Sequence, residues 1–209
     1  MSITTPGDLP SKPSVYHGSC HCGTIRYSIK LTFPIVKSND RLAKLVRVYK
    51  CNCTTCHKMA MFHCRVANPA TDFILTSPSA IEEMGEYRTA EKVIGWYFCK
   101  NCGVRVFGVG GGWVQREIDG GEWGEAADEG VRKTVWATEE GPLIKRVFDG
   151  KEIEMPLHYV SVNAVTLEGV DLREWHEKGW MFYVDRRFDS KPGFRWEGPY
   201  ENIVIALQD

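Results

Sequence analysis

The chain contains a Cys-x-Cys-x-x-Cys run formed by Cys51, Cys53 and Cys56. Cysteines that serve only as small hydrophobic residues have no reason to recur at this spacing, so the run predicts a metal site. If Cys51 and Cys53 lie on a strand, their side chains share a face, and a turn through Thr54 and Thr55 returns Cys56 to them. Zinc binds thiolates tetrahedrally, and three protein ligands leave a fourth position for water or substrate.

Length, charge and cysteine content limit the classes of protein that fit. A chain of 209 residues that is 43% hydrophobic can bury one substantial core. The net charge of −1 argues against a nucleic-acid partner. The N-terminus lacks the basic and apolar pattern of a secretory signal, and no stretch approaches a membrane span. We therefore expect a cytoplasmic protein with no membrane partner, in which eight cysteines serve as metal ligands rather than disulfides.

Short segments of alternating or β-prone residues, separated by turn residues, predict a mainly β fold with few short helices. The expected strands are Thr24–Ile29, Leu45–Tyr49, Met61–Val66, Asp72–Thr76, Val93–Phe98, Val104–Phe107, Tyr159–Leu167 and Trp180–Val184. The segment Ser79–Glu86 predicts a short helix.

We expect residues 1–14 to form a mobile tail because they carry three prolines and little apolar content. Residues 15–209 then form a single domain, with extended loops at about 108–154. The glycines of Gly108–Gly112 and the acidic segment Glu117–Gly130 are typical of surface loops. The C-terminal extension Phe188–Asp209 ends in an apolar segment, Ile203–Leu207, which we expect to pack on the sheet.

Seven of the eight cysteines form three groups, namely Cys20/Cys22, Cys51/Cys53/Cys56 and Cys99/Cys102. A zinc ribbon would combine the Cys-x-x-Cys motifs at Cys53 and Cys99, leaving three cysteines without a site. The other partition joins the first and last groups in a closed four-thiolate site and keeps the middle group as a separate, open one. That partition uses all seven cysteines, and its structural zinc closes a loop of about 75 residues.

The cysteine motifs occur in a characteristic order: Gly18–Gly23 reads Gly-x-Cys-x-Cys-Gly, Cys51–Lys58 ends in a basic pair, and Phe98–Gly103 reads Phe-Cys-x-x-Cys-Gly. This order resembles the glutathione-dependent formaldehyde-activating enzyme family, which also includes centromere protein V. The resemblance continues more weakly through Tyr159–Gly169 and covers most of residues 16–185. It implies a compact fold of tent-like β-sheets and two zinc ions per chain. One would be structural on Cys20, Cys22, Cys99 and Cys102, and one catalytic on Cys51, Cys53 and Cys56.

The family's activity implies a carbon-sulfur lyase that acts on glutathione or another small-molecule thiol and its adducts, in the manner of S-hydroxymethylglutathione synthase. Met59–Phe62 departs from the small residue or glycine that often follows the basic pair, and the loops between Gly108 and Glu154 are long. The adduct is therefore left open. A non-catalytic, zinc-stabilised binding module is the alternative. A redox protein would require a strand-to-helix setting for Cys-x-x-Cys, which the sequence does not indicate.

Several other residues have both a functional and a purely structural interpretation. His57 and His63 are candidates for proton transfer or a fourth ligand, although surface or hydrogen-bonded histidines are commoner. Cys64 is a candidate ligand but fits a core position better. The basic residues near the open site would suit the carboxylates of glutathione or simply form a solvated face; they are Arg41, Lys44, Arg47, Lys50, Lys58 and Arg65. Trp113, Trp123 and Trp136 either line a pocket or pack in the core.

Overall fold

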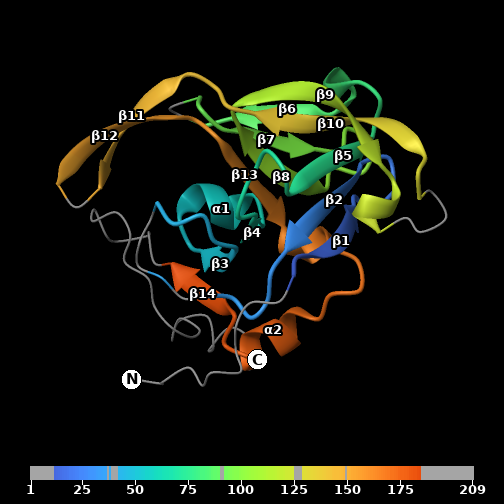
Figure 1. Cartoon of the computed structure of the whole chain (residues 1–209). Coiled ribbons are helices and arrows are strands. Elements are labelled where there is room, and N and C mark those ends of the chain that lie inside the picture. Colours follow the sequence, from blue (N-terminus) through green and yellow to red (C-terminus); the bar gives the residue numbers. More distant parts are fainter. Residues whose placement is uncertain are drawn as a thin grey trace.

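The computed structural model describes residues 12–36, 38, 42–89, 92–124, 129–148 and 150–184. Within these ranges the protein is mainly β with few short helices, as the sequence predicts (Figure 1). Residues 1–11 of the expected tail, Arg41 and the C-terminal extension lie outside the described residues.

Two β-sheets build the body of the protein. The five-stranded sheet has the order β1-β2-β5-β10-β9, with β1 (Ser14–Ser19), β2 (Arg26–Leu31), β5 (Phe73–Ser77), β10 (Arg132–Glu139) and β9 (Gly112–Asp119). The seven-stranded sheet has the order β14-β3-β4-β13-β8-β7-β6, with β14 (Met181–Val184), β3 (Arg47–Cys51), β4 (Phe62–Arg65), β13 (Tyr159–Asn163), β8 (Arg105–Gly110), β7 (Gly95–Phe98) and β6 (Gly85–Arg88). In the seven-stranded sheet, β14 pairs with β3 in parallel, and the other neighbours are antiparallel.

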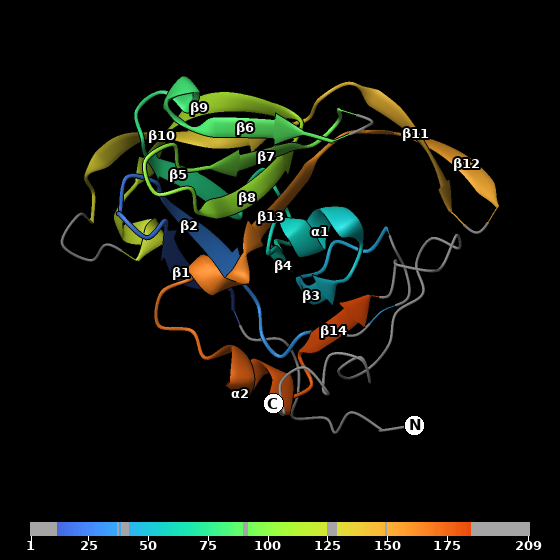
Figure 2. The same cartoon turned by 180° about the vertical axis from the view of Figure 1, so that it is seen from behind.

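A separate hairpin consists of β11 (Leu143–Phe148) and β12 (Lys151–Pro156). Figures 1 and 2 show it projecting from the two sheets on the side of α1 (Thr54–Lys58). The second α-helix, α2 (Leu172–Glu177), begins after Asp171, whose carboxylate accepts hydrogen bonds from the backbone N–H groups of Arg173 and Glu174. The described residues also contain the short 3₁₀ turns η1 (Ile81–Glu83), η2 (Gly121–Trp123) and η4 (Ala164–Thr166).

The main core lies between the two sheets. Phe107 of β8 contacts Tyr27 of β2 and Phe73 of β5, with ring centroids 5.6 and 5.2 Å apart. All three side chains are fully buried. Because side chains alternate along a strand, the residues next to Phe107 on β8 face the other side of the seven-stranded sheet. That opposite face carries the candidate site described below.

The predicted strands correspond to β2, β3, β4, β5, β7, β8, β13 and β14, with ends that differ by a few residues. The loop predictions were wrong in their secondary structure. Gly108 and Gly110 belong to β8, β9 runs from Gly112 to Asp119, and β10, β11 and β12 lie within the segment expected to be looped. Ser79–Glu86 contains the 3₁₀ turn η1 and the start of β6 instead of a helix. The division into a tail and a single domain stays a prediction.

Packing explains why β8 contains glycine at positions 108 and 110. A Cβ atom on Gly108 would lie 2.7 Å from the indole ring of Trp96, and one on Gly110 would lie 3.1 Å from the side chain of Leu157. The glycines therefore let large side chains lie across the sheet, and they do not mark a loop.

Candidate metal centres

Four cysteines gather where the two sheets meet. The Sγ atoms of Cys20, Cys22, Cys99 and Cys102 all lie within 4.8 Å of one another. Cys20 and Cys22 directly precede β2 of the five-stranded sheet, and Cys99 and Cys102 join β7 to β8 of the seven-stranded sheet. A metal held by these thiols would tie one sheet to the other. The four-thiolate partition is therefore the one found in the structure, and the zinc-ribbon partition is not.

A glycine with positive φ closes the turn after each cysteine pair. Gly23 and Gly103 follow the second cysteine of each pair with φ of +74° and +73°, a conformation that side chains other than glycine rarely adopt. Their backbone N–H groups donate to the carbonyl oxygens of Cys20 and Cys99 at 3.0 and 2.8 Å. These turns bring the two sulfurs of each pair toward one point.

The surroundings of these thiols differ from one cysteine to the next. Burial raises the pKa of Cys20 to about 11. Hydrogen bonding from Thr24, whose hydroxyl lies 3.2 Å from the sulfur, lowers the pKa of the exposed Cys22 to about 5. The backbone N–H of Val104 lowers the pKa of Cys102. The set thus contains groups that favour the thiolate, the form in which cysteine binds metal.

Three cysteines form the second cluster. The Sγ atoms of Cys51, Cys53 and Cys56 lie within 4.8 Å of one another. Cys51 ends β3, Cys53 is the N-cap of α1, and Cys56 lies within this helix. Backbone N–H groups of Cys53 and Cys56 donate to the sulfurs of Cys51 and Cys53 at 3.5 and 3.4 Å. Such bonds stabilise negative charge on sulfur, so the donor set suits a thiolate-binding metal such as zinc.

The segment that closes this cluster is a five-residue helix and not the simple turn expected through Thr54 and Thr55. The Cys-x-x-Cys motif therefore does lie between a strand and a helix, contrary to the sequence-based expectation. Because the third thiol, Cys51, belongs to the same cluster, the arrangement has the donor set of a metal site in addition to that of a dithiol.

The three thiols of this cluster differ in pKa. Interaction with the neighbouring Cys51 and Cys56 holds the pKa of Cys53 far below its ordinary value. Hydrogen bonding with Cys53 raises the pKa of Cys51, and hydrogen bonding with Cys51 and Cys53 raises the pKa of Cys56. The cluster therefore favours the first thiolate at Cys53 over one at either neighbour.

Asn163 of β13 fixes the segment that returns from α1 to β4. Its side-chain oxygen accepts from the backbone N–H of Phe62 at 2.9 Å. Its side-chain nitrogen donates to the carbonyl oxygens of Ala60 and Arg105 at 3.3 and 3.1 Å. This buried amide locks the exit of α1 onto the sheet and so helps to position Cys56.

His63 contacts the cluster directly. Its Nε2 lies 3.1 Å from the Sγ of Cys56, and its Nδ1 lies 3.0 Å from the Oγ of Ser161 and 3.4 Å from the hydroxyl of Tyr159. The ring stacks on Tyr49 with centroids 4.5 Å apart and planes 10° apart. Burial lowers the pKa of His63 to about 3, so the imidazole is neutral at pH 7.

The register of the sheet explains why these residues meet. Tyr49 pairs with His63 across β3 and β4, and Asn163 pairs with His63 across β13 and β4. Cys51 follows Tyr49 by two residues and therefore points to the same face. Cys64 faces the core, is fully buried and lies outside the cluster. His57 is exposed on α1.

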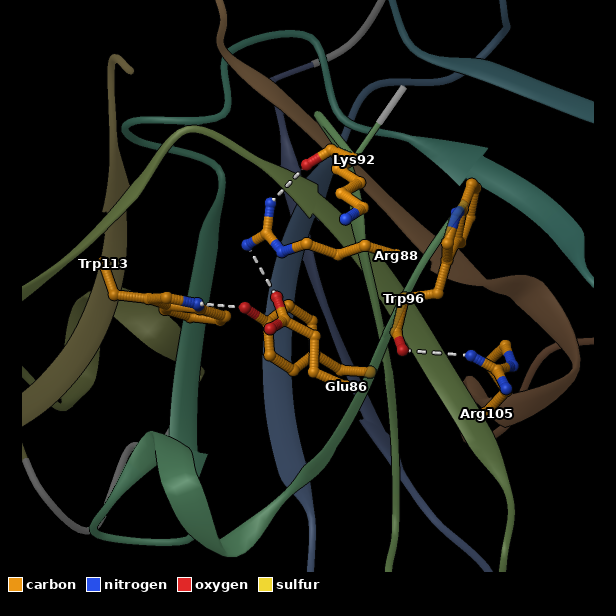
Figure 3. A network of polar contacts seen from close by, with 7 residues as sticks. Glu86, Arg88, Lys92, Trp96, Arg105 and Trp113 are labelled. Atoms are coloured by element: carbon orange, nitrogen blue, oxygen red, sulfur yellow. Dashed lines mark hydrogen bonds and ion pairs between the residues drawn. The ribbon is translucent and has the colours of Figure 1, made fainter. Parts of the chain in front are cut away.

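Trp96 of β7 belongs to the same buried cluster as Cys51 and Cys56. Its ring also meets His63 edge to face at 5.8 Å. Figure 3 shows how its strand is fixed: the guanidinium of Arg105 donates to the carbonyl oxygen of Trp96 at 3.0 Å, and Arg88 bridges Glu86 and the carbonyl oxygen of Lys92. The indole Nε1 of Trp96 is buried and has no hydrogen-bond partner among the described residues.

The three-cysteine cluster opens into a groove of about 1190 Å³. The groove runs past His63, Tyr49 and Trp96 to the β11–β12 hairpin, where Ile144 and Met155 line it. Four cationic residues also line it, namely Lys44, Arg65, Arg116 and Arg146, together with two exposed acidic residues, Glu139 and Glu140. The four-cysteine cluster does not line this groove.

The remaining residues predicted from the sequence have other positions. Lys50 lies over the ring of Phe62, Lys58 is exposed on α1, and Arg47 is buried. The three tryptophans pack or bond elsewhere: Trp113 donates to the hydroxyl of Tyr97, Trp123 lies under Lys30, and Trp136 donates to the carbonyl oxygen of Ser79. Their structural interpretation therefore holds.

The fold and the two clusters define a mainly β protein with one four-thiol and one three-thiol site that can bind metal, consistent with zinc. Residues 15–117 match the model of the family described as glutathione-dependent formaldehyde-activating enzyme, and they include all seven clustered cysteines. This segment of the chain is therefore similar to that family.

Other comparisons are more distant. One solved structure that matches the chain is the crystal structure of a Rhodobacter sphaeroides protein, with 15% identity, a TM-score of 0.42, and coverage of 81% of this chain and 97% of that one. No protein with a curated function matches the chain. Among the described residues, the helices are too short or too polar to cross a membrane.

Proposed function

We propose that the protein is a zinc-dependent carbon-sulfur lyase that acts on glutathione, or another small thiol, and its adducts. Cys51, Cys53 and Cys56 hold the catalytic zinc, and the four-cysteine cluster holds a structural zinc, two per chain. The contrast between the clusters carries this proposal. The four-thiol set completes a tetrahedral shell by itself, whereas the three-thiol set is one ligand short and opens into a large groove.

Zinc on three thiolates readily accepts another thiolate and keeps a substrate thiol deprotonated at neutral pH. In the synthetic direction, the substrate sulfur bonds to the carbon of an aldehyde such as formaldehyde, and the proton lost from the thiol ends on the aldehyde oxygen. The reverse direction breaks the carbon-sulfur bond. The chain's own contribution is to fix the three thiolates, to surround them with buried aromatic rings and to orient the thiol through the groove.

The charges of the groove suit an anionic thiol. Arg65 lies with its guanidinium over the ring of Tyr159 at 4.9 Å, close to the cluster, and Arg116 and Lys44 lie near His158 further along. Glutathione carries two carboxylates and one ammonium, which match these cations and the nearby Glu139 and Glu140. All eight cysteines are free of disulfides, and a reducing compartment such as the cytoplasm suits that state.

A calorimetric titration of glutathione into the purified protein, with zinc counted on the same sample, tests the proposal. We expect two zinc ions per chain and saturable binding, which Cys53→Ser abolishes together with turnover. Thr54→Ser, on the neighbouring exposed residue, is the matched control and should leave both unchanged. Two zinc ions with no binding of glutathione would instead favour the non-catalytic binding module, and turnover retained in Cys53→Ser would refute the assignment of the catalytic cysteines.

A further inference from the structure

The β11–β12 hairpin lies outside the segment that matches the family model, yet it forms a wall of the groove. Figures 1 and 2 show that the hairpin projects away from both sheets, and among the described strands its two strands pair only with each other. An isolated two-stranded hairpin is only marginally stable in water. Its position makes it a candidate for substrate recognition.

The two faces of the hairpin differ in exposure. Ile144 pairs with Met155 across the two strands, and both side chains are partly covered and line the groove. Leu143 and Val147 lie on the opposite face and are 62% and 61% exposed. The groove face thus carries an apolar pair, Ile144 and Met155, beside the cationic Arg146, which also lines the groove.

The groove is far larger than a formaldehyde adduct requires. Clefts of roughly 300–1,000 Å³ hold ligands of drug size, and this groove measures about 1190 Å³. Between the hairpin and the cysteines, Leu157 and Ile94 are further apolar residues that line the groove. A small hydroxymethyl group on the substrate sulfur would leave most of this apolar surface exposed to water.

We propose that the groove binds a bulky apolar group carried on the substrate sulfur, and that Ile144 and Met155 of the hairpin determine this specificity. The inference rests on the proposed lyase function, because that function places the sulfur at the three cysteines. The preferred substrates are then adducts of a thiol with a larger apolar electrophile, such as a long-chain or aromatic aldehyde.

The test compares S-hexylglutathione with S-methylglutathione by calorimetry on the zinc-loaded full-length protein. Each methylene removed from water strengthens binding by about fourfold, so five extra methylenes buried to half their extent give about a 30-fold preference for the hexyl compound. We expect Ile144→Asn and Met155→Asn each to reduce this preference at least threefold. Leu143→Asn changes the adjacent residue on the outer face and should preserve it.

The outcomes separate this inference from the proposed function. The assignment of the groove would be overturned by equal affinities for the two compounds in the wild-type protein. It would also be overturned if the preference for the hexyl compound survived in both Ile144→Asn and Met155→Asn. Glutathione binding that persists in Cys53→Ser would overturn the lyase site without altering the hexyl preference. Zinc content and thermal unfolding of each hairpin variant show whether it is folded.

Discussion

Replacement of His63 should weaken metal binding at the three-cysteine site, because it removes the hydrogen bond between His63 and Cys56. A metal-bound Cys56 is a thiolate and has no proton, so a neutral His63 can bond to it only as an Nε2–H donor across 3.1 Å. Its Nδ1 then accepts from the hydroxyl of Ser161 at 3.0 Å. The structure therefore predicts one tautomer and a hydroxyl-imidazole-thiolate chain.

The size of the effect follows from that bond. A hydrogen bond to a charged group contributes about 1.5–3 kcal/mol, and each 1.4 kcal/mol is a factor of ten in affinity. His63→Leu should therefore lower zinc affinity about 10- to 100-fold, the range known for residues that support metal ligands. His63→Gln offers an amide N–H in a similar place and should restore most of the affinity. Tyr49 loses its stacking partner in both variants, so this loss does not distinguish them.

Zinc affinity is measured by competition with a chromophoric chelator, and cobalt substitution supplies a spectroscopic reading. Loss of the N–H donor raises the electron density on the Cys56 sulfur, so the sulfur-to-cobalt charge-transfer band should move to longer wavelength in His63→Leu and stay in place in His63→Gln. A band unmoved in His63→Leu, or equal shifts in both variants, would show that the imidazole does not bond to the thiolate and that the reasoning is wrong.

Two further predictions concern stability. Cys99→Ser should lower the thermal unfolding temperature markedly, and removal of the metal with a chelator should have a similar effect, because the four-thiol cluster links the two sheets. Cys53→Ser should change the unfolding temperature little. Equal losses for the two variants in calorimetry would contradict the structural role of the four-thiol cluster. Burial raises the pKa of Tyr97 to about 12, so the folded state holds this proton more tightly than the unfolded state. The contribution of Tyr97 is complete below pH 10 and falls by up to about 1.4 kcal/mol per pH unit as pH rises from 10 to 12. Denaturant titrations of Tyr97→Phe should show a shallower alkaline loss than those of the exposed control Tyr87→Phe, and identical slopes would exclude this linkage.

Local patterns were sufficient for the cysteine partition and for part of the strands, but they did not predict β9 to β12. Apolar alternation located β2, apolar and β-prone segments located β4 and β13, and spacing alone favoured the grouping of Cys20 with Cys99 that the structure contains. The glycine content of β8 led to a wrong prediction of a loop, because a glycine in a sequence can have either of two causes, a turn of the chain or the close approach of another side chain. Gly108 has the second cause, since the indole of Trp96 occupies the space of its side chain. The partner that decides between the two causes lies on another strand.

The sequence did not predict the surroundings of the three-cysteine site, because these too depend on residues from other strands. The motif identified Cys51, but Tyr49, Ser161 and Trp96 join the site only through pairing between strands that are distant in sequence. The sequence did contain one signal for these surroundings. Because side chains alternate along a strand, His63 and Arg65 share a face and Cys64 lies on the other. The lone cysteine and the histidine therefore could not both face the metal. Which face met the cysteines depended on β3 lying beside β4. The motif thus supplies the ligands, and the sheet register supplies the groups that tune them.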